Sequence, residues 1–509
     1  MRTVPQETSP NLLPHERLLI GGAILACVGA VVAVQLLPER YILLSAVLLL
    51  GAPLASLVFL RQFRANALLL MLILVPLTGI FKAISGSRFA PLTFDLGILA
   101  ALAIYMAGQI TRGRQRVGWV DLLHVLFLGL AFFQMFNPNV PSLQAGVEGF
   151  RKFAYMSIAL YAGRYTFTDT MARRFEWLLI ILSVPIAAYG IKQFLMPSSL
   201  DYRLIDLSTA SEVTYLMGGR LRPFATLPGP FHLGLYLVVA GLITFRMMLT
   251  TRLWSIRFWA LGMALGVQMI TLFLTRTKGN WVGMAVGVGV IILFQIALSP
   301  NLRQKLRRLM VGTAIASVAV VALLAVALSG RIPVLTDALG AVLDPLNAPT
   351  FIYRLQIWRD ELLPALVQHP LIGYGTSSAG EGLSVYYEGA TSFFVASHNL
   401  FLKVQIELGA FGLLIFLAII GLCLRRGLSS LRYYARTSPG RLQTTQWAIA
   451  VACAFLVSGL VTPVLDAYPA NYYFWLLLGL MTRPWGQATQ LAAAPASLPP
   501  SMIIPGPTP

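Results

Sequence analysis

Long apolar segments alternate with short polar ones along almost the whole chain. A helix needs about 20 mostly apolar residues to cross the hydrocarbon core of a bilayer. Segments that approach this length lie at 18–37, 41–60, 66–84, 92–110, 118–136, 153–165, 175–196, 228–249, 256–275, 280–299, 309–329, 399–424, 445–466 and 470–486. Because 153–165 and 470–486 are short, the pattern predicts an all-α polytopic membrane protein with about 12–14 transmembrane helices.

The same pattern divides the chain into five regions. We expect an N-terminal segment at 1–17, a transmembrane bundle at 18–329, a long outer loop at 330–397, further transmembrane helices at 398–486 and a disordered Ala/Pro-rich tail at 487–509. Within the long loop, apolar residues recur at helical spacing, which predicts an amphipathic helix at the membrane surface followed by a turn at 373–375. They are Leu355, Trp358, Leu362, Ala365 and Leu366.

Composition and charge agree with a membrane location. Hydrophobic residues make up 57% of the chain and charged residues only 11%, which excludes an ordinary water-soluble protein. Nearly all of the net charge of +19 lies in one set of alternating loops. By the positive-inside rule these loops and both termini are cytoplasmic. The basic excess is therefore a topology signal, helped by anionic membrane lipid, and predicts no nucleic-acid partner.

Two basic clusters fall on the opposite, outer side. Arg220 and Arg222 precede a Pro/Gly-rich helix entry near 228, and arginine offers paired donors to phosphate oxygens. Arg276 and Lys278 lie in a short connection at the N-terminus of the next helix, which also favours an anion. Interfacial arginines that reach lipid headgroups, and a tight polar turn, are the structural alternatives.

Two further polar clusters lie in and after the long loop. Tyr353, Arg354 and Trp358 could bind a carbohydrate, since sugars stack on aromatic rings; a solvated helix face explains the same residues. His398 stands where the loop re-enters the membrane and is a candidate proton acceptor, although a lone histidine is more often structural.

Three residues that follow His398 share one helix face. Asn399, Lys403 and Glu407 are spaced four residues apart within an apolar segment, so this face cannot be turned toward lipid.

Motifs for other chemistries are missing from the sequence. The chain has no H-E-x-x-H, G-x-S-x-G or Walker motif. Its three cysteines lie in apolar runs without metal-type spacing. We therefore expect no metal and no cofactor.

Five stretches occur in an order that resembles one family. Residues 189–194 look like Y-G-x-x-Q-F, 222–234 like R-x-x-[SG]-T-x-x-x-P, and 274–281 like L-T-x-S-R-G-x-W. Residues 354–375 look like R-x-x-x-W leading to P-L-x-G-x-G, and 397–412 like H-N-x-x-L with E-x-G-x-x-G. The sequence thus resembles the O-antigen ligase and O-antigen polymerase superfamily of bacterial envelope glycosyltransferases.

The resemblance implies metal-independent glycan transfer on the periplasmic side of the bacterial inner membrane. The donor would be a glycan on undecaprenyl diphosphate, and the acceptor either lipid A-core, for a ligase, or another lipid-linked glycan, for a polymerase. Arg222, with Arg220, and Lys278 or Arg276 would bind the diphosphate; strict register puts Lys278 where the family usually has arginine. His398 would orient or deprotonate the acceptor hydroxyl, beside the glycan-binding candidates Arg354, Trp358, Tyr353 and Asn399.

Two other function classes fit a polytopic protein. A polysaccharide transporter or lipid-linked-glycan flippase would more often show internal repeats and charges near mid-membrane. The sequence shows no such repeat, and its candidate groups gather at the outer interface. A structural assembly subunit would leave the polar face at 399–407 unexplained.

Overall fold

The computed structural model describes residues 117–206, 215–217, 220–253, 255–298, 349–380 and 393–483, and a few single positions between 69 and 79 and between 383 and 389. The spans expected before 117 and at 309–329, the N-terminal segment 1–17 and the tail 487–509 lie outside the described residues. The division at 330 and 398 remains a prediction.

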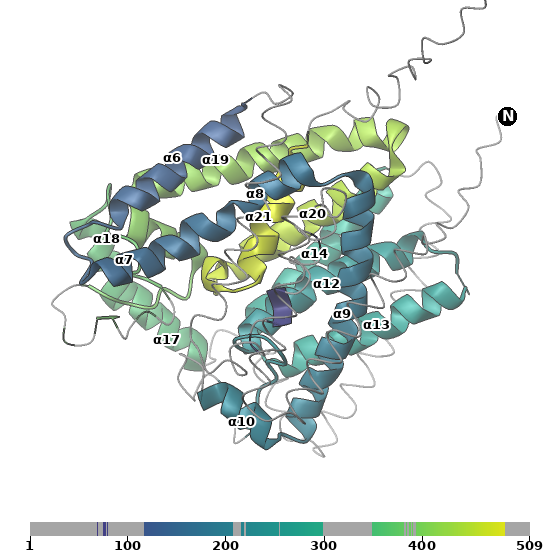
Figure 1. The fold of residues 1–509 in the computed structure, drawn as a ribbon, viewed down its shortest axis with the longest axis horizontal. Coiled ribbons are helices and arrows are strands. Elements are labelled where there is room, and N and C mark those ends of the chain that lie inside the picture. Colours follow the sequence, from purple (N-terminus) through teal and green to yellow (C-terminus); the bar gives the residue numbers. More distant parts are fainter. Residues whose placement is uncertain are drawn as a thin grey trace, which may run out of the picture.

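Helices dominate the described part of the chain (Figure 1). The α-helices are α6 (Trp119–Gln134), α7 (Leu143–Phe150), α8 (Ala159–Tyr161), α9 (Asp169–Leu195), α10 (Ser199–Asp206), α12 (Pro230–Thr250), α13 (Ile256–Leu274), α14 (Lys278–Ala297), α17 (Pro349–Ile357), α18 (Leu363–Gln368), α19 (Leu400–Thr437), α20 (Pro439–Ser458) and α21 (Ala470–Met481). Short π segments are η3 (Arg151–Tyr155), η4 (Ala162–Thr166) and η5 (Trp358–Leu362), and 3-10 turns are η2 (Val75–Leu77) and η7 (Val464–Asp466). Two-residue strands β1 (Leu216–Met217) and β2 (Arg220–Leu221) form one antiparallel pair.

The all-α polytopic prediction is confirmed. Within the described ranges, five helices are long and apolar enough to cross a membrane: α9, α12, α13, α14 and α19. The shorter α6 is also apolar. These six helices coincide with the predicted spans 175–196, 228–249, 256–275, 280–299, 399–424 and 118–136.

Three predicted spans differ from the observed elements. The segment 153–165 is interrupted by the π segments η3 and η4. The span expected at 445–466 is α20, which starts earlier and ends at Ser458, so Asp466 lies in a connection and not inside a helix spanning the membrane. The last helix, α21, has only 12 residues.

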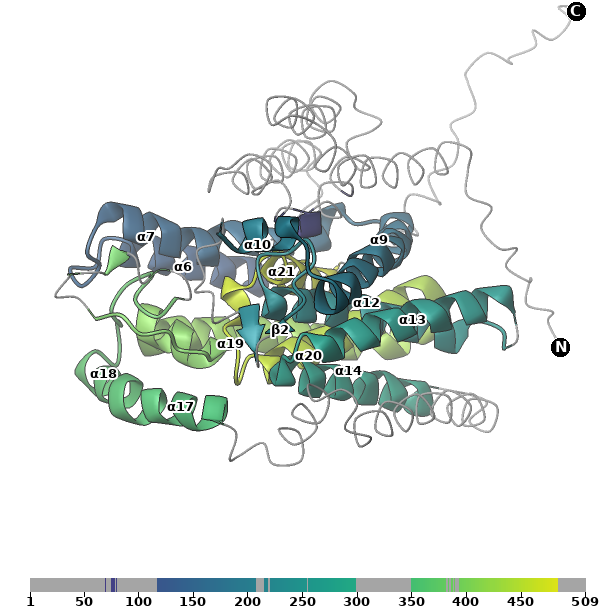
Figure 2. The same cartoon turned by 90° about the horizontal axis from the view of Figure 1, so that it is seen from below.

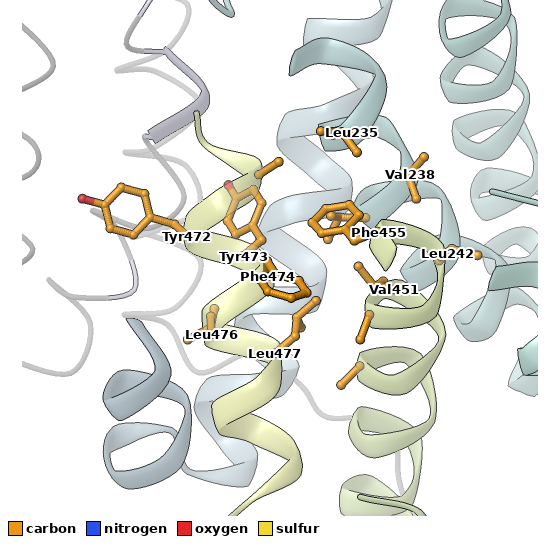
Figure 3. Packing of buried hydrophobic residues seen from close by; sticks show 14 of the residues in the cluster. Leu235, Val238, Leu242, Val451, Phe455, Tyr472, Tyr473, Phe474, Leu476 and Leu477 are labelled. Atoms are coloured by element: carbon orange, nitrogen blue, oxygen red, sulfur yellow. The ribbon is translucent and has the colours of Figure 1, made fainter. Parts of the chain in front are cut away.

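Helix α21 lies at the centre of the packed bundle. Every one of its residues is buried, and α12 is buried along most of its length. A helix that is apolar all round is stable only when neighbours cover all its faces. Figure 3 shows this packing, with Phe474 and Leu477 of α21 facing Val451 and Phe455 of α20, and Leu235 of α12 close by.

Side-chain contacts show which connections between helices lie at the same end of the bundle. At one end Asp169, at the start of α9, binds Arg441 near the start of α20 and Arg483 after α21, with N–O distances of 3.0 and 3.1 Å. At the other end the Ser458 hydroxyl donates to the Gly279 carbonyl (3.0 Å). Arg441 and Arg483 therefore lie at the opposite end of the bundle from Gly279 and the candidate site residues.

The helix in the long loop is present and packs four of the five predicted stripe residues into a cluster: Trp358, Leu362, Ala365 and Leu366. Helices α17 and α18 with the π segment between them lie beside α19 (Figure 2). Ile357, Leu362 and Ala365 pack against Tyr374 and Ile406, whereas Leu355, expected on the apolar stripe, is 44% exposed. The π segment adds a residue to the turn and so rotates the stripe.

Helix α19 is broken at Gly409, and the long loop binds at the break. Gly409 has a φ of 69° and a ψ of −174°, a conformation open almost only to glycine. The Ile406 and Glu407 carbonyls accept hydrogen bonds from the backbone of Tyr374 (2.7 Å) and Gly375 (3.1 Å). The break therefore attaches the predicted 373–375 turn, where Gly373 and Gly375 also have positive φ, to the bundle.

Replacing Gly409 with alanine should destabilise the protein by about 1–3 kcal/mol from the backbone conformation alone. A Cβ at this position would also meet the backbone of Leu371. Gly421→Ala in the same helix is the matched control, because a Cβ there meets no atom within 4 Å and alanine favours helix. Thermal unfolding of the purified protein should show a lower midpoint for the first variant only. Equal midpoints would contradict this account of the break.

Candidate active site

Arg222 connects two loops at the outer end of the bundle. Its backbone N–H donates to the Tyr215 carbonyl (2.7 Å), and its side-chain Nε donates to the Thr275 carbonyl (3.0 Å). Burial and the neighbouring cations Arg276 and Arg354 lower the pKa of the Arg222 guanidinium to about 10, so it stays charged at neutral pH. Arg222 is thus close enough to two arginines from other segments for both to repel it, which a bound anion would relieve.

The connection between α13 and α14 is held rigidly. The Thr275 and Thr277 hydroxyls bind each other (2.7 Å), and the Asn280 amide donates to Thr277 (3.1 Å) and to the Phe231 carbonyl (3.1 Å). The Trp281 ring stacks on Phe273 with 4.9 Å between centroids. This network fixes the loop that carries Arg276 and ends in Lys278, the first residue of α14.

Helix α17 brings a fourth cation to the same place. Arg354 interacts electrostatically with both Arg222 and Lys278. Arg222, Arg276, Lys278 and Arg354, here called the cation cluster, therefore come from three separate segments of the chain. The free N–H groups at the start of α14 add partial positive charge. Such an arrangement is suited to an anion with several oxygens.

Two sets of contacts place His398 near the cation cluster. The Trp358 indole N–H donates to the Ser397 carbonyl (2.8 Å), directly before His398. Trp358 follows Arg354 by four residues, so the two lie about 6 Å apart along the helix axis.

The second set of contacts runs through the end of α20. Leu400 N–H donates to the Gly459 carbonyl (2.7 Å), while the neighbouring Ser458 hydroxyl binds the Gly279 carbonyl (3.0 Å). Residues 458–459 therefore lie between the start of α19, next to His398, and the start of α14, next to Lys278. The imidazole and the cation cluster share one end of the bundle.

The loops of this site hold unusual backbone conformations. Among the non-glycine residues that the structure describes, four have positive φ: Ala225 (52°), Arg276 (56°), Ser377 (84°) and His398 (48°). Each such residue costs on the order of 1–3 kcal/mol, and such residues gather at functional sites because the surroundings hold them there. Three of the four carry or adjoin the site residues.

The remaining predicted residues have other surroundings. Arg220 is exposed and lies over the Phe194 ring, 5.9 Å from its centroid. Tyr353 is 59% exposed on α17. The Asn399 side chain caps α19: its Oδ1 accepts from the backbone of Phe401 (2.8 Å) and Leu402 (3.0 Å), and its amide donates to the Leu460 carbonyl (2.8 Å). This side chain orders the helix start beside His398, since an N-cap satisfies otherwise free N–H groups.

The polar face below Asn399 is buried, as its spacing predicts. Lys403 Nζ lies 2.7 Å from Glu407 Oε1 and 3.2 Å from Asp466 Oδ1, and Lys152 Nζ lies 3.5 Å from the same Asp466 oxygen. Glu407 Oε1 also accepts the Ala379 N–H (3.1 Å). These four residues, here called the ionic quartet, join η3, α19, η7 and the long loop directly beneath the site.

Sequence reasoning missed several of these partners. Asp466 and Lys152 belong to the ionic quartet, and Asp201 belongs to a network behind Arg222 that is described below. An acidic residue near the end of an apolar span was the signal available for Asp466. Thr275, whose carbonyl binds Arg222, gave no signal apart from its place in a motif.

The part of the chain described by the structure gathers no group of three His, Cys, Asp or Glu side chains suited to a metal ion. Metal independence remains a prediction.

Comparison with known proteins gives one result for the middle of the chain. No curated protein matches the sequence. Residues 263–417 match the family model described as O-Antigen ligase, a range that includes Arg276, Lys278, Arg354 and His398 but not Arg222. The match confirms the resemblance to the O-antigen ligase superfamily and supports a membrane glycosyltransferase of the ligase or polymerase type.

Proposed function

We propose that the protein transfers a glycan from undecaprenyl diphosphate to a hydroxyl group of an acceptor glycan at the periplasmic face of the bacterial inner membrane. The observation that carries the proposal is the cation cluster, in which Arg222 lies close enough to Arg276 and to Arg354 for their charges to interact. A diphosphate offers several anionic oxygens to these donors. In this proposal both Arg276 and Lys278 bind the diphosphate.

Charge moves toward this cluster as the reaction proceeds. The acceptor oxygen attacks the anomeric carbon of the donor sugar, and the bond from that carbon to the diphosphate oxygen breaks. Its electron pair leaves with the undecaprenyl diphosphate, where the cations stabilise it more strongly than in the ground state. The hydroxyl proton passes to the imidazole of His398. All atoms are accounted for without a nucleotide sugar.

The aromatic side chains near His398 are suited to sugars. Trp358 is held by its indole hydrogen bond to Ser397, and Tyr353 is largely exposed on the same helical segment. The acceptor is lipid A-core for a ligase, or another lipid-linked glycan for a polymerase. Complete polymers on the lipid carrier would accumulate when a ligase is inactivated, and single repeats when a polymerase is.

Replacing Arg222 with alanine should lower glycan transfer by about 10²–10³-fold, the usual cost of removing one donor that stabilises developing charge. Transfer is measured in membranes with undecaprenyl-diphosphate-linked glycan as donor, at equal amounts of protein. Arg252→Ala is the control, because Arg252 is an exposed arginine just after the other end of α12. It should transfer at the normal rate.

A result in which Arg222→Ala transfers normally would contradict the proposed function. If the same variant instead fails to move lipid-linked glycan across vesicles, while no transfer product forms with the unaltered protein, the flippase alternative would replace it.

A further inference from the structure

A buried carboxylate lies behind the loop that carries Arg222. The side chain of Asp201, in α10, is fully buried and accepts five hydrogen bonds. Its donors are Tyr189 Oη (2.7 Å), Lys192 Nζ (2.8 Å), Gln193 Nε2 (2.9 Å), Ser198 N (2.7 Å) and Ser198 Oγ (2.7 Å). None of these groups belongs to the cation cluster or carries out a step of the proposed reaction.

The charge state of Asp201 follows from these donors. Burial by itself raises the pKa of the carboxyl, but the hydrogen bonds from Lys192, Ser198 and Tyr189 outweigh it and hold the pKa at about 2. Because this lies below the ordinary value of about 3.9, the stabilisation is present above that value and is lost as pH falls toward 2. At neutral pH Asp201 is therefore ionised and acts only as an acceptor.

An acceptor at this place fixes the orientation of Gln193. The amide nitrogen of Gln193 must face Asp201, which leaves its Oε1 on the opposite side. That oxygen accepts the backbone N–H groups of Phe224 (3.1 Å) and Ala225 (2.6 Å), and Nε2 also reaches the Ala225 carbonyl (3.3 Å). With the amide reversed, its NH₂ group would face both backbone donors and neither bond could form.

The backbone held by Gln193 is the strained part of the Arg222 loop. Ala225 has a φ of 52°, which the surroundings must stabilise. Arg222 stands two and three residues before the two N–H groups that Gln193 binds. Its guanidinium reaches the Thr275 carbonyl at 3.0 Å and interacts with Arg276 and Arg354. The conformation of the loop thus decides where the guanidinium lies.

We propose that Asp201 is a positioning residue for Arg222, acting through Gln193, whose orientation it fixes. The inference rests on the proposed function, in which Arg222 binds the donor diphosphate. Asp201 touches no reacting atom, so its effect should appear in the use of the donor and not of the acceptor. A misplacement of about 1 Å at a reacting group can cost about 10²-fold.

The first test is Asp201→Asn, which keeps the shape but places a donor or a weaker acceptor opposite Gln193. The KM for undecaprenyl-diphosphate-linked glycan should rise, or kcat fall, by about 10–100-fold, with the acceptor KM unchanged. Asp206→Asn is the matched control, because Asp206 is an exposed aspartate on the same helix. It should leave both constants unchanged.

The decisive test exchanges the carboxylate and the amide group between positions 201 and 193. In the double variant Asp201→Asn with Gln193→Glu, the new asparagine donates to the new glutamate, whose second oxygen again accepts from Phe224 and Ala225. Of the bonds made by position 193, only the long one to the Ala225 carbonyl (3.3 Å) is lost. Donor kinetics should return to within about threefold of the original, which a merely structural role for each residue would not produce. If Asp201→Asn does not accumulate in membranes, Gln193→Met is measured instead and should raise the donor KM in the same way.

The outcomes separate the two proposals. Normal donor kinetics in Asp201→Asn, or in Gln193→Met if that variant is needed, together with an inactive Arg222→Ala, would overturn the positioning role and leave the proposed function standing. Failure of the exchange variant to recover would also overturn it. Normal kinetics in Arg222→Ala itself would overturn the proposed function.

Discussion

Replacing His398 with alanine is expected to reduce glycan transfer by about 10²–10⁴-fold, the range usual for loss of a general base. The amount of protein in the membrane should hold, because the imidazole is not part of the buried core. The expected loss follows from where His398 lies in the fold. It stands next to the Asn399 cap of α19, and its neighbour Ser397 accepts a hydrogen bond from Trp358. Residues 458–459 contact both Leu400 of α19 and Gly279 of α14, so His398 and the start of α14 are at the same end of the bundle.

The backbone conformation of His398 makes asparagine a better test substitution than alanine. Its φ of 48° lies in the left-handed region, which asparagine tolerates better than most residues. His398→Asn should therefore fold at least as well as His398→Ala and still lack a base. His369→Ala is the control, since His369 is an exposed histidine in the same outer loop. Transfer at the normal rate in His398→Asn would contradict the role given to the imidazole.

Replacing Lys403 with methionine is expected to cause the largest loss of stability, about 3–5 kcal/mol, because it removes the cation paired with the buried Glu407 carboxylate. Lys403 and Glu407 are both 0% exposed, and Asp466 lies 3.2 Å from the same ammonium group. Thermal unfolding of the purified protein measures the effect as a lower midpoint. Arg425→Met, an exposed cation on the same helix, should leave the midpoint nearly unchanged.

A double variant shows whether the loss of stability comes from breaking the ion pair or only from removing one charge. In Lys403→Met with Glu407→Met the remaining members of the ionic quartet are Asp466 and Lys152, which can still pair with each other (3.5 Å). This double variant should unfold at a higher temperature than Lys403→Met alone, since replacing a whole buried pair by apolar groups costs far less than breaking it. An unfolding midpoint of Lys403→Met equal to that of the unaltered protein would contradict the account.

Hydrophobic pattern alone was enough to predict the class of fold and most helix positions that the structure describes. It also predicted that Lys403 and Glu407 could not face lipid, because charges four residues apart in an apolar span require partners. The partners themselves could not be read from the sequence. Asp466 lay within a predicted span, and Lys152 is separated from it by more than half of the chain. Such pairings are tertiary and leave no local pattern.

The sequence motifs named the candidate site residues one by one but did not indicate how they are arranged in space. Arginine binds both sugars and phosphates, and the sequence assigned Arg354 to the sugar. Only the fold shows that Arg354 lies beside the cations Arg222 and Lys278. Asn399 stood at a helix start, where its type favours capping, and that is what its side chain does. Asp201 had no signal, since one acidic residue in a polar loop is ordinary until its five donors are known.

Binding of the donor tests the central claim most directly, because it separates the cations from the base. The full-length protein in lipid nanodiscs is titrated with undecaprenyl-diphosphate-linked glycan in the unaltered form, as Arg222→Ala, as Arg354→Ala and as His398→Asn. Both arginine variants should bind the donor at least about tenfold more weakly, since a charged hydrogen bond contributes about 1.5–3 kcal/mol. His398→Asn should bind it normally and yet transfer glycan about 10²–10⁴-fold more slowly. Unchanged binding in both arginine variants would contradict the claim that the cation cluster holds the diphosphate.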